Sequence, residues 1–204
     1  MKKVLMMLGA VLVTAAITLP SSAQGTTGRV ERTQAELAME KAETDFAKLK
    51  ETREEAKTKC AAREYQACYE LAEFERKGLG GPQDLSAAAK NYKKVCAAKD
   101  GRGCAGLAYL TVQGRGVSAN LTEGRRLYKA SCDLGEVSGC AAWGNMAFTG
   151  TGGPKDVQGG TRALQEACQK DYAWACERIQ ALGAFDPDGE SQQRLRQIER
   201  KAGN

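Results

Sequence analysis

Eight cysteines divide most of this 204-residue chain into equal intervals. The two cysteines of a pair are 8 residues apart, and each pair follows the previous one at an offset of 36 residues. The pairs are Cys60 and Cys68, Cys96 and Cys104, Cys132 and Cys140, and Cys168 and Cys176. A fixed period of this length is typical of a repeat array, in which each unit packs on its neighbours.

The residues between the cysteines repeat as well, and their pattern predicts two helices in each unit. Apolar residues three apart, such as Leu71 and Phe74, form one face of a first helix. This helix runs from about the second cysteine of a pair to a Gly-x-Gly motif, since glycine accepts the left-handed backbone that ends a helix. Residues able to cap a helix then begin the second helix, which ends near the next cysteine; they are Asp84, Asn120 and Asp156.

The cysteine pairs are predicted to form disulfides rather than metal sites. Eight residues of continuous helix span about 12 Å, whereas the Cα atoms of a disulfide lie about 4.4–6.8 Å apart, so the chain must turn inside each pair. We expect Gly101 and Gly103, and then Gly135 and Gly139, to supply this turn in the middle units. Zinc sites favour closer C-x-x-C pairs or histidine, and the sequence contains neither. The predicted bridges are Cys60–Cys68, Cys96–Cys104, Cys132–Cys140 and Cys168–Cys176.

The first 23 residues are typical of a signal peptide. Lys2 and Lys3 precede a 16-residue apolar run from Val4 to Leu19, and small residues follow up to Ala23. A run of this length is shorter than the ~20 residues that span a membrane as a helix. We therefore predict a bacterial protein exported to the periplasm or beyond, with no stable membrane insertion after cleavage. Disulfides persist in such compartments.

Two polar segments flank the predicted array. Residues 31–60 carry a thin, alanine-rich stripe at helical spacing, which predicts one long charged helix. This helix either caps the array, the reading we favour, or serves as a coiled-coil arm for dimerisation. The predicted division is 1–23 signal peptide, 24–59 charged helix, 60–185 repeat array, and 186–204 capping helix and tail.

Binding residues are sought where the units differ, because the core positions of a repeat array recur. In the last unit Trp174 replaces Gln66, Arg102 and Ser138, and Tyr172 replaces acidic residues. Aromatic and arginine side chains dominate interface energetics, although packing of a closing helix would explain these two aromatic residues equally well. The candidate binding residues are Arg102, Tyr109, Gln113, Asn145, Tyr172, Trp174 and Arg178.

The cysteine spacing, the 36-residue helix pair and the motif Gly-x-Gly-x-x-x-(Asp/Asn) together resemble the Sel-one-like repeat family. The resemblance is closer still to the Helicobacter-type cysteine-rich proteins built from disulfide-bridged repeats. It is carried by CAAKDGRGCAGLAYLTVQGRGVSANLTEGRRLYKAS and CDLGEVSGCAAWGNMAFTGTGGPKDVQGGTRALQEA, and it covers residues 60–185. It implies an all-α fold, a right-handed αα-solenoid of disulfide-bridged 36-residue helix-turn-helix repeats, here preceded by the long N-terminal helix.

The resemblance implies a scaffold for other proteins. We predict an exported protein that binds a protein partner, or a cell-wall fragment, on the concave face of its first helices. The formal net charge of +5, or +3 without residues 1–23, indicates no nucleic-acid partner, which needs a clustered basic face.

An enzyme is the alternative function. Some cysteine-rich members of the family are described as binding or slowly hydrolysing β-lactams, so a weak β-lactam or peptidoglycan-related enzyme stays open by resemblance alone. The sequence shows no catalytic motif for it, since Ser86 and Lys90 are one residue further apart than Ser-x-x-Lys requires. The absence of histidine also excludes Ser-His-Asp and Cys-His catalysis. We predict no catalytic residues, no metal and no cofactor.

Overall fold

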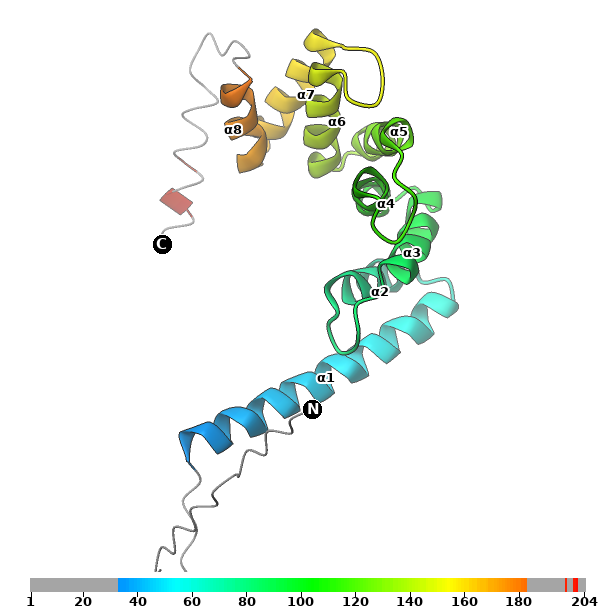
Figure 1. Cartoon of the computed structure of the whole chain (residues 1–204), viewed down its shortest axis with the longest axis vertical. Coiled ribbons are helices and arrows are strands. Elements are labelled where there is room, and N and C mark those ends of the chain that lie inside the picture. The colour runs from blue at the N-terminus through cyan, green and yellow to red at the C-terminus, as the bar shows by residue number, and fades with distance from the viewer. Residues whose placement is uncertain (1–32, 183–196, 198–199, 202–204) are drawn as a thin grey trace, which may run out of the picture.

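The computed structural model describes residues 33–182 together with 197, 200 and 201. The predicted signal peptide, 1–23, lies outside the described residues, as does nearly all of the segment 186–204. Eight helices follow one another along the described chain (Figure 1): α1 (Gln34–Ala61), α2 (Tyr65–Lys77), α3 (Leu85–Ala97), α4 (Gly101–Gln113), α5 (Leu121–Asp133), α6 (Val137–Thr149), α7 (Val157–Gln169) and α8 (Ala173–Ala181).

The helices form the predicted array of helix pairs. The first helices of the units are α2, α4, α6 and the shorter α8, and the second helices are α3, α5 and α7. Each helix packs on the next along the chain, and Figure 1 shows the pairs stacked along an arc. Large apolar side chains on the facing sides are fully buried, among them Val95, Leu110, Leu164 and Ile179. None of the described helices is long and apolar enough to cross a membrane.

The predicted helix ends are confirmed. The first helices end at glycines in the left-handed region, with φ of 70°, 64° and 78° at Gly78, Gly114 and Gly150. The second helices begin at side chains that accept a backbone N–H bond of 2.8–2.9 Å from three residues further on; they are Asp84, Asn120 and Asp156. The first helices begin three residues before the second cysteine of each pair, whereas the prediction placed their start at about that cysteine.

The four predicted disulfides are present. Their Cα–Cα separations are 4.3–4.8 Å, and all eight cysteines are paired. Each bridge joins the end of one helix to the first turn of the next, as Cys96 near the end of α3 is joined to Cys104 in α4. The bridges therefore connect each repeat to the following one.

The prediction that glycines make the turn inside the pairs is wrong for three of the four residues named. The turn needs one residue with positive φ, and this residue falls at the same place in every unit: Arg63, Lys99, Gly135 and Asp171. Gly101, Gly103 and Gly139 lie in the first turns of α4 and α6 instead. There they allow close helix packing, because a Cβ added to Gly103 would lie 2.5 Å from the Cβ of Val95.

The second half of α1 takes the place of a second helix. A Cβ added to Gly80 would lie 2.5 Å from the carbonyl oxygen of Leu49 in α1. At the two positions 36 and 72 residues further on, a glycine meets the first residue of α3 and of α5 at 2.4 and 2.3 Å in the same way. Residues 49–61 therefore pack on the array as a second helix does, and the choice between a cap and a dimerisation arm for the whole segment stays a prediction.

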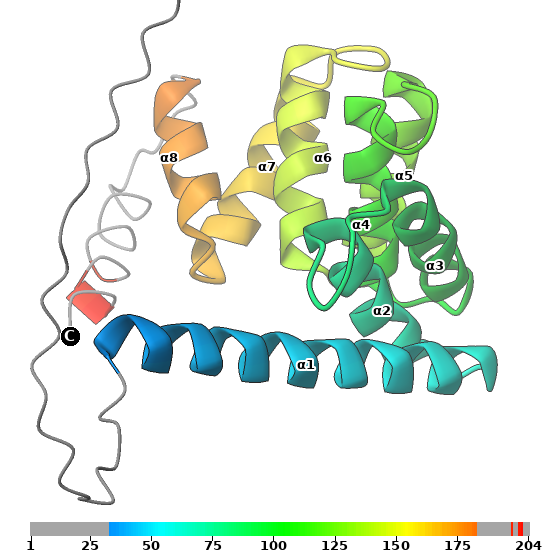
Figure 2. The same ribbon diagram turned by 60° about the horizontal axis from the view of Figure 1, so that its bottom comes forward.

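The first half of α1 has a different environment. All side chains from residue 34 to residue 48 are exposed, including those of Leu37, Met39 and Phe46. Figures 1 and 2 both show this half extending beyond α2, which is the element that α1 packs against. Dimerisation through this segment stays a prediction.

Candidate functional site

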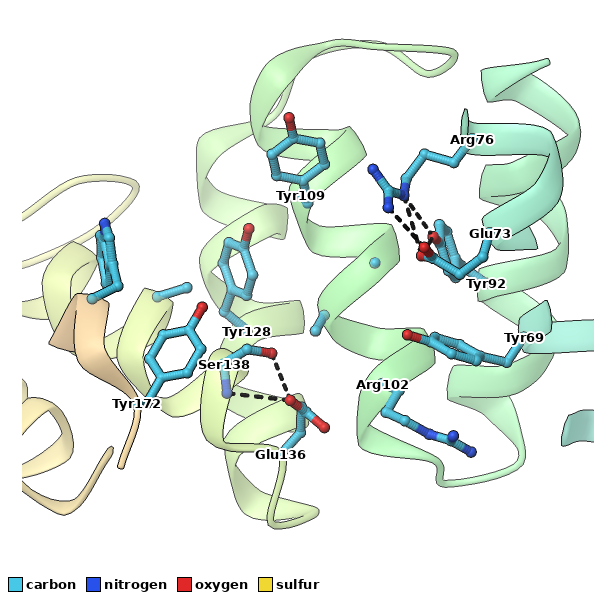
Figure 3. Close-up of a pocket in the computed structure, with 14 residues that line it drawn as sticks. Tyr69, Glu73, Arg76, Tyr92, Arg102, Tyr109, Tyr128, Glu136, Ser138 and Tyr172 are labelled. Carbon is cyan, nitrogen blue, oxygen red and sulfur yellow. Dashed lines mark hydrogen bonds and ion pairs between the residues drawn. The ribbon is translucent and has the colours of Figure 1, made fainter. Parts of the chain in front are cut away.

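A groove of about 470 Å³ lies along the first helices, with lining residues on elements from α2 to α8 (Figure 3). Only 6% of the residues of the chain are aromatic, yet this one groove gathers five of its six tyrosines and one of its two tryptophans. We call it the tyrosine groove, and its aromatic residues are Tyr69, Tyr92, Tyr109, Tyr128, Tyr172 and Trp174. Tyrosine and tryptophan combine a large apolar area with a polar group, and both are enriched at interfaces.

An ionic cluster forms the end of the groove nearest α2. Glu73 accepts hydrogen bonds from Arg76 at 2.7 and 3.1 Å and from the hydroxyl of Tyr92, and it forms an ion pair with Lys77 at 2.9 Å. Burial would raise the pKa of Glu73, but the bonds from these three side chains outweigh it and lower the pKa to about 2. Burial and the neighbouring carboxylate raise the pKa of Tyr92 well above its ordinary value. The cluster therefore holds an ionised Glu73 and a neutral Tyr92 in fixed positions.

Arg102 lines the groove beside Tyr69 and is held on three sides. Its guanidinium pairs with Asp100 at 2.6 Å and donates to the side-chain oxygen of Gln66 at 2.7 Å. Its Cζ lies 4.6 Å from the centre of the Tyr69 ring, a cation–π contact. The hydrogen bonds with Asp100 raise the pKa of Arg102 and lower that of the carboxyl group.

Aromatic rings form the other end of the groove. Tyr172 and Trp174 meet edge to face, with ring centres 6.5 Å apart. Burial, followed by the neighbouring Tyr109 and Tyr172, raises the pKa of Tyr128 to about 12. In Figure 3, Tyr128 and Tyr172 lie beside Glu136, which caps α6, whereas Glu73 and Tyr92 lie at the opposite end.

The structure brings four of the seven predicted binding residues to the groove: Arg102, Tyr109, Tyr172 and Trp174. The other three do not line this groove, and whether they bind a partner stays a prediction. Asn145 and Arg178 bond to each other at 2.6 Å, which joins α6 to α8 away from the lining. Gln113 is exposed at the last residue of α4. Whether the four lining residues bind a partner stays a prediction.

Sequence reasoning missed several lining residues because it considered only the first helices and only one of their faces. Tyr92 and Tyr128 lie on the second helices α3 and α5, one 36-residue period apart. The recurrence of tyrosine at this position of the repeat was the sequence signal from which both residues could have been predicted. Tyr69 and Arg76 flank the chosen face of α2, where Arg102 of α4 lies over the ring of Tyr69 and Arg76 donates to the hydroxyl of Tyr92 in α3.

In the described part of the chain, no three cysteine or acidic side chains lie together as metal ligands would. The one serine that lines the groove, Ser138, donates its hydroxyl at 2.6 Å to Glu136, which caps the same helix. Both residues lie at the start of α6, so this hydrogen bond is part of the cap of that helix.

The sequence pattern of the Sel1 repeat matches residues 66–100, 101–136 and 137–171, more than half of the chain. Each matched segment contains one first helix and the second helix that follows it. No curated protein sequence matches the chain significantly.

Solved structures resemble the fold at low sequence identity. A Sel1 repeat protein from Oxalobacter formigenes superposes with a TM-score of 0.65 at 22% identity, over 84% of this chain and 76% of that one. The protective antigen c5321 of uropathogenic Escherichia coli, which displays an SLR fold, gives 0.63 at 20% identity, over 83% of this chain and 41% of that one. The cysteine-rich protein B of Helicobacter pylori gives 0.48 at 23% identity, over 61% and 95%. The first two show a shared fold.

Proposed function

This chain belongs to the Sel1 repeat family, and we propose that it is an exported repeat scaffold that binds a protein partner in the tyrosine groove. The observation that carries the proposal is the gathering of five tyrosines and Trp174 in one hollow of a chain that has few aromatic residues. Rings held by several helices lose little conformational freedom on binding, which favours affinity.

The rigidity of the array supports the same proposal. The groove is lined by residues from four consecutive units, and disulfides connect each unit to the next. The ionic cluster around Glu73 fixes Tyr92 at one end, and edge-to-face contact orders Trp174 at the other. A surface prepared in this way binds without a large rearrangement.

Export is supported by the four disulfides and by the signal peptide predicted for residues 1–23. Protein recovered from the periplasmic fraction of the source bacterium should begin at Gln24, and its mass should rise by about eight mass units on reduction, two for each bridge. A protein that keeps residues 1–23, or that shows free thiols, would contradict export.

The binding site is tested with the double variant Tyr109→Ala/Trp174→Ala. Wild-type protein should capture a protein from bacterial envelope extract, and the double variant should lose it, because two exposed groove anchors are removed. Tyr65→Ala is the matched control, since Tyr65 lies outside the groove and is 43% exposed, as Trp174 is.

Circular dichroism must show the same helix content for all three proteins. Equal capture by wild type and double variant would place the binding site elsewhere. Retention on purified peptidoglycan, with no captured protein, would replace the protein partner by cell-wall material.

A further inference from the structure

The charged side chains that line the tyrosine groove are not equally neutralised. Glu73 pairs with Arg76 at 2.7 Å, and Arg102 pairs with Asp100 at 2.6 Å. The fourth charged lining residue is Glu136, which has no cation within 4 Å in the part of the chain that the structure describes. The groove therefore contains one carboxylate that forms no direct ion pair with the described residues.

Only one oxygen of Glu136 is occupied. Its Oε1 accepts from the backbone N–H of Ser138 at 3.2 Å and from the hydroxyl of Ser138 at 2.6 Å, and both bonds cap α6. Among the described residues no donor reaches Oε2, and Figure 3 shows the bonds ending on a single oxygen. A carboxylate has room for more hydrogen bonds than these two.

The repeat makes this position distinctive. The equivalent residue two units earlier is Glu64, which is exposed and outside the groove. One unit earlier it is Asp100, which Arg102 neutralises. In the last unit Tyr172 replaces the acid. Glu136 is thus the only member of its column that is both acidic and unpaired inside the groove, among the described residues.

Arg102 is nearby but is committed to other partners. Its guanidinium bonds to Asp100 and Gln66 and stacks on Tyr69, all of them on the side of α2 and the start of α4. Glu136 lies close enough to contribute to the raised pKa of Arg102, but no described cation forms an ion pair with it. Its Oε2 is therefore open to a cation that a ligand supplies.

The surroundings of Glu136 also suit a cation. Tyr128 and Tyr172 lie at the same end of the groove as Glu136, and Trp174 meets the ring of Tyr172 edge to face. The faces of such rings attract an ammonium or guanidinium group. Tyr172 lies close enough to contribute to the raised pKa of Tyr128. An aromatic wall with one carboxylate combines a cation–π contact with a charge-assisted hydrogen bond.

We infer that this end of the tyrosine groove binds a lysine or arginine side chain of the protein partner, with Glu136 as its counter-ion and Tyr128, Tyr172 and Trp174 as its aromatic wall. The inference rests on the proposed function, since it names the side chain that a bound protein segment places in the groove.

The test uses a phage-displayed library of random dodecapeptides, selected on the oxidised full chain. Selected peptides should require the groove, so that Tyr109→Ala/Trp174→Ala abolishes their binding, and they should share a lysine or arginine. One such peptide is then labelled and its affinity is measured by fluorescence anisotropy. Replacing its basic residue by norleucine should weaken binding about tenfold, and Glu136→Gln should weaken binding of the original peptide to the same extent.

The two changes together should cost no more than either one alone, because they remove the same contact. Glu64→Gln is the matched control and should leave the affinity unchanged. The norleucine peptide needs no protein variant, so the test holds even if Glu136→Gln weakens the cap of α6. Groove-dependent peptides without a shared basic residue, or additive losses, would overturn this inference and leave the proposed function standing. Failure to obtain any groove-dependent peptide would overturn both.

Discussion

The tyrosine groove and the first half of α1 both expose large apolar side chains, but only the groove holds them in place. Tyr109 and Trp174 are 40% and 43% exposed, and they lie among residues from six elements of the array. Met39 and Phe46 are 65% and 53% exposed on a helix segment that extends past α2. Exposure alone therefore does not distinguish the two regions, and we propose partner binding only where exposed rings are fixed by several elements.

The contrast continues within α1 itself. Residues 49–61 are seated like a second helix, with Ala56 and Cys60 buried, although their sequence is as charged as the exposed half. What differs is the loop after α2, which approaches the second half closely, since a Cβ added to Gly80 would lie 2.5 Å from the carbonyl group of Leu49. The location of packing partners, rather than helix propensity, decides which part of α1 belongs to the array.

The largest effect is expected where α1 is seated. Gly80→Ala adds a Cβ 2.5 Å from the carbonyl group of Leu49, at a residue with φ of 63°. Backbone strain and overpacking together should lower the free energy of unfolding by about 3 kcal/mol in guanidinium denaturation. Gly135→Ala is the control, because φ there is 85° but no atom lies within 4 Å, so only the strain of about 1 kcal/mol is expected. Equal losses would mean that α1 is not tightly seated at Gly80.

The next effect concerns the ionic end of the groove. Glu73→Gln removes the ion pairs with Arg76 and Lys77 and should cost about 2 kcal/mol at pH 7. The pKa of Glu73 is about 2 in the folded chain against an ordinary 4.5, so this stabilisation is complete above about pH 4.5 and is lost as the pH falls toward 2.

Denaturation curves for wild type and Glu73→Gln should therefore converge as the pH falls through that range. Glu70→Gln, one turn earlier on the exposed side of α2, is the control and should leave the pH profile of wild type intact. A constant difference between wild type and Glu73→Gln at all pH values would show that the ionised carboxylate does not stabilise this end.

A smaller effect tests whether α1 and α5 are seated alike. Arg53 of α1 and Arg125 of α5 lie two periods apart, and both donate hydrogen bonds to two carbonyl groups of a following loop. Arg53→Ala and Arg125→Ala should each cost about 1 kcal/mol in thermal or chemical denaturation. If only Arg125→Ala lowers the stability, the loop after α2 does not hold α1 in the way that the equivalent loop holds α5.

The smallest effect is expected from the free half of α1. Deleting residues 34–45 removes side chains that are all exposed, so the free energy of unfolding should change by less than about 0.5 kcal/mol. Light scattering on the same pair of proteins tests the coiled-coil alternative. A dimer that becomes a monomer on deletion would show that the exposed half of α1 has a partner after all.

The period of the sequence determined much of this protein. It predicted the helix pairs, the glycines and caps at their ends, and all four disulfides, because each of these depends on residues a few positions apart along the chain. The turn inside the cysteine pairs was mispredicted for a local reason. Glycine is the common solution for positive φ, but Arg63, Lys99 and Asp171 adopt it here, while Gly103 serves packing.

Only the tertiary structure decided which side chains of different units form a common groove. Repeat comparison found Tyr109 and Trp174, but the groove also needs Tyr92 and Tyr128 from the second helices and the unpaired carboxylate of Glu136. These side chains are remote in sequence and meet only when the units stack. The sequence period determines the shape of each unit, and the stacking of the units determines which side chains share a surface.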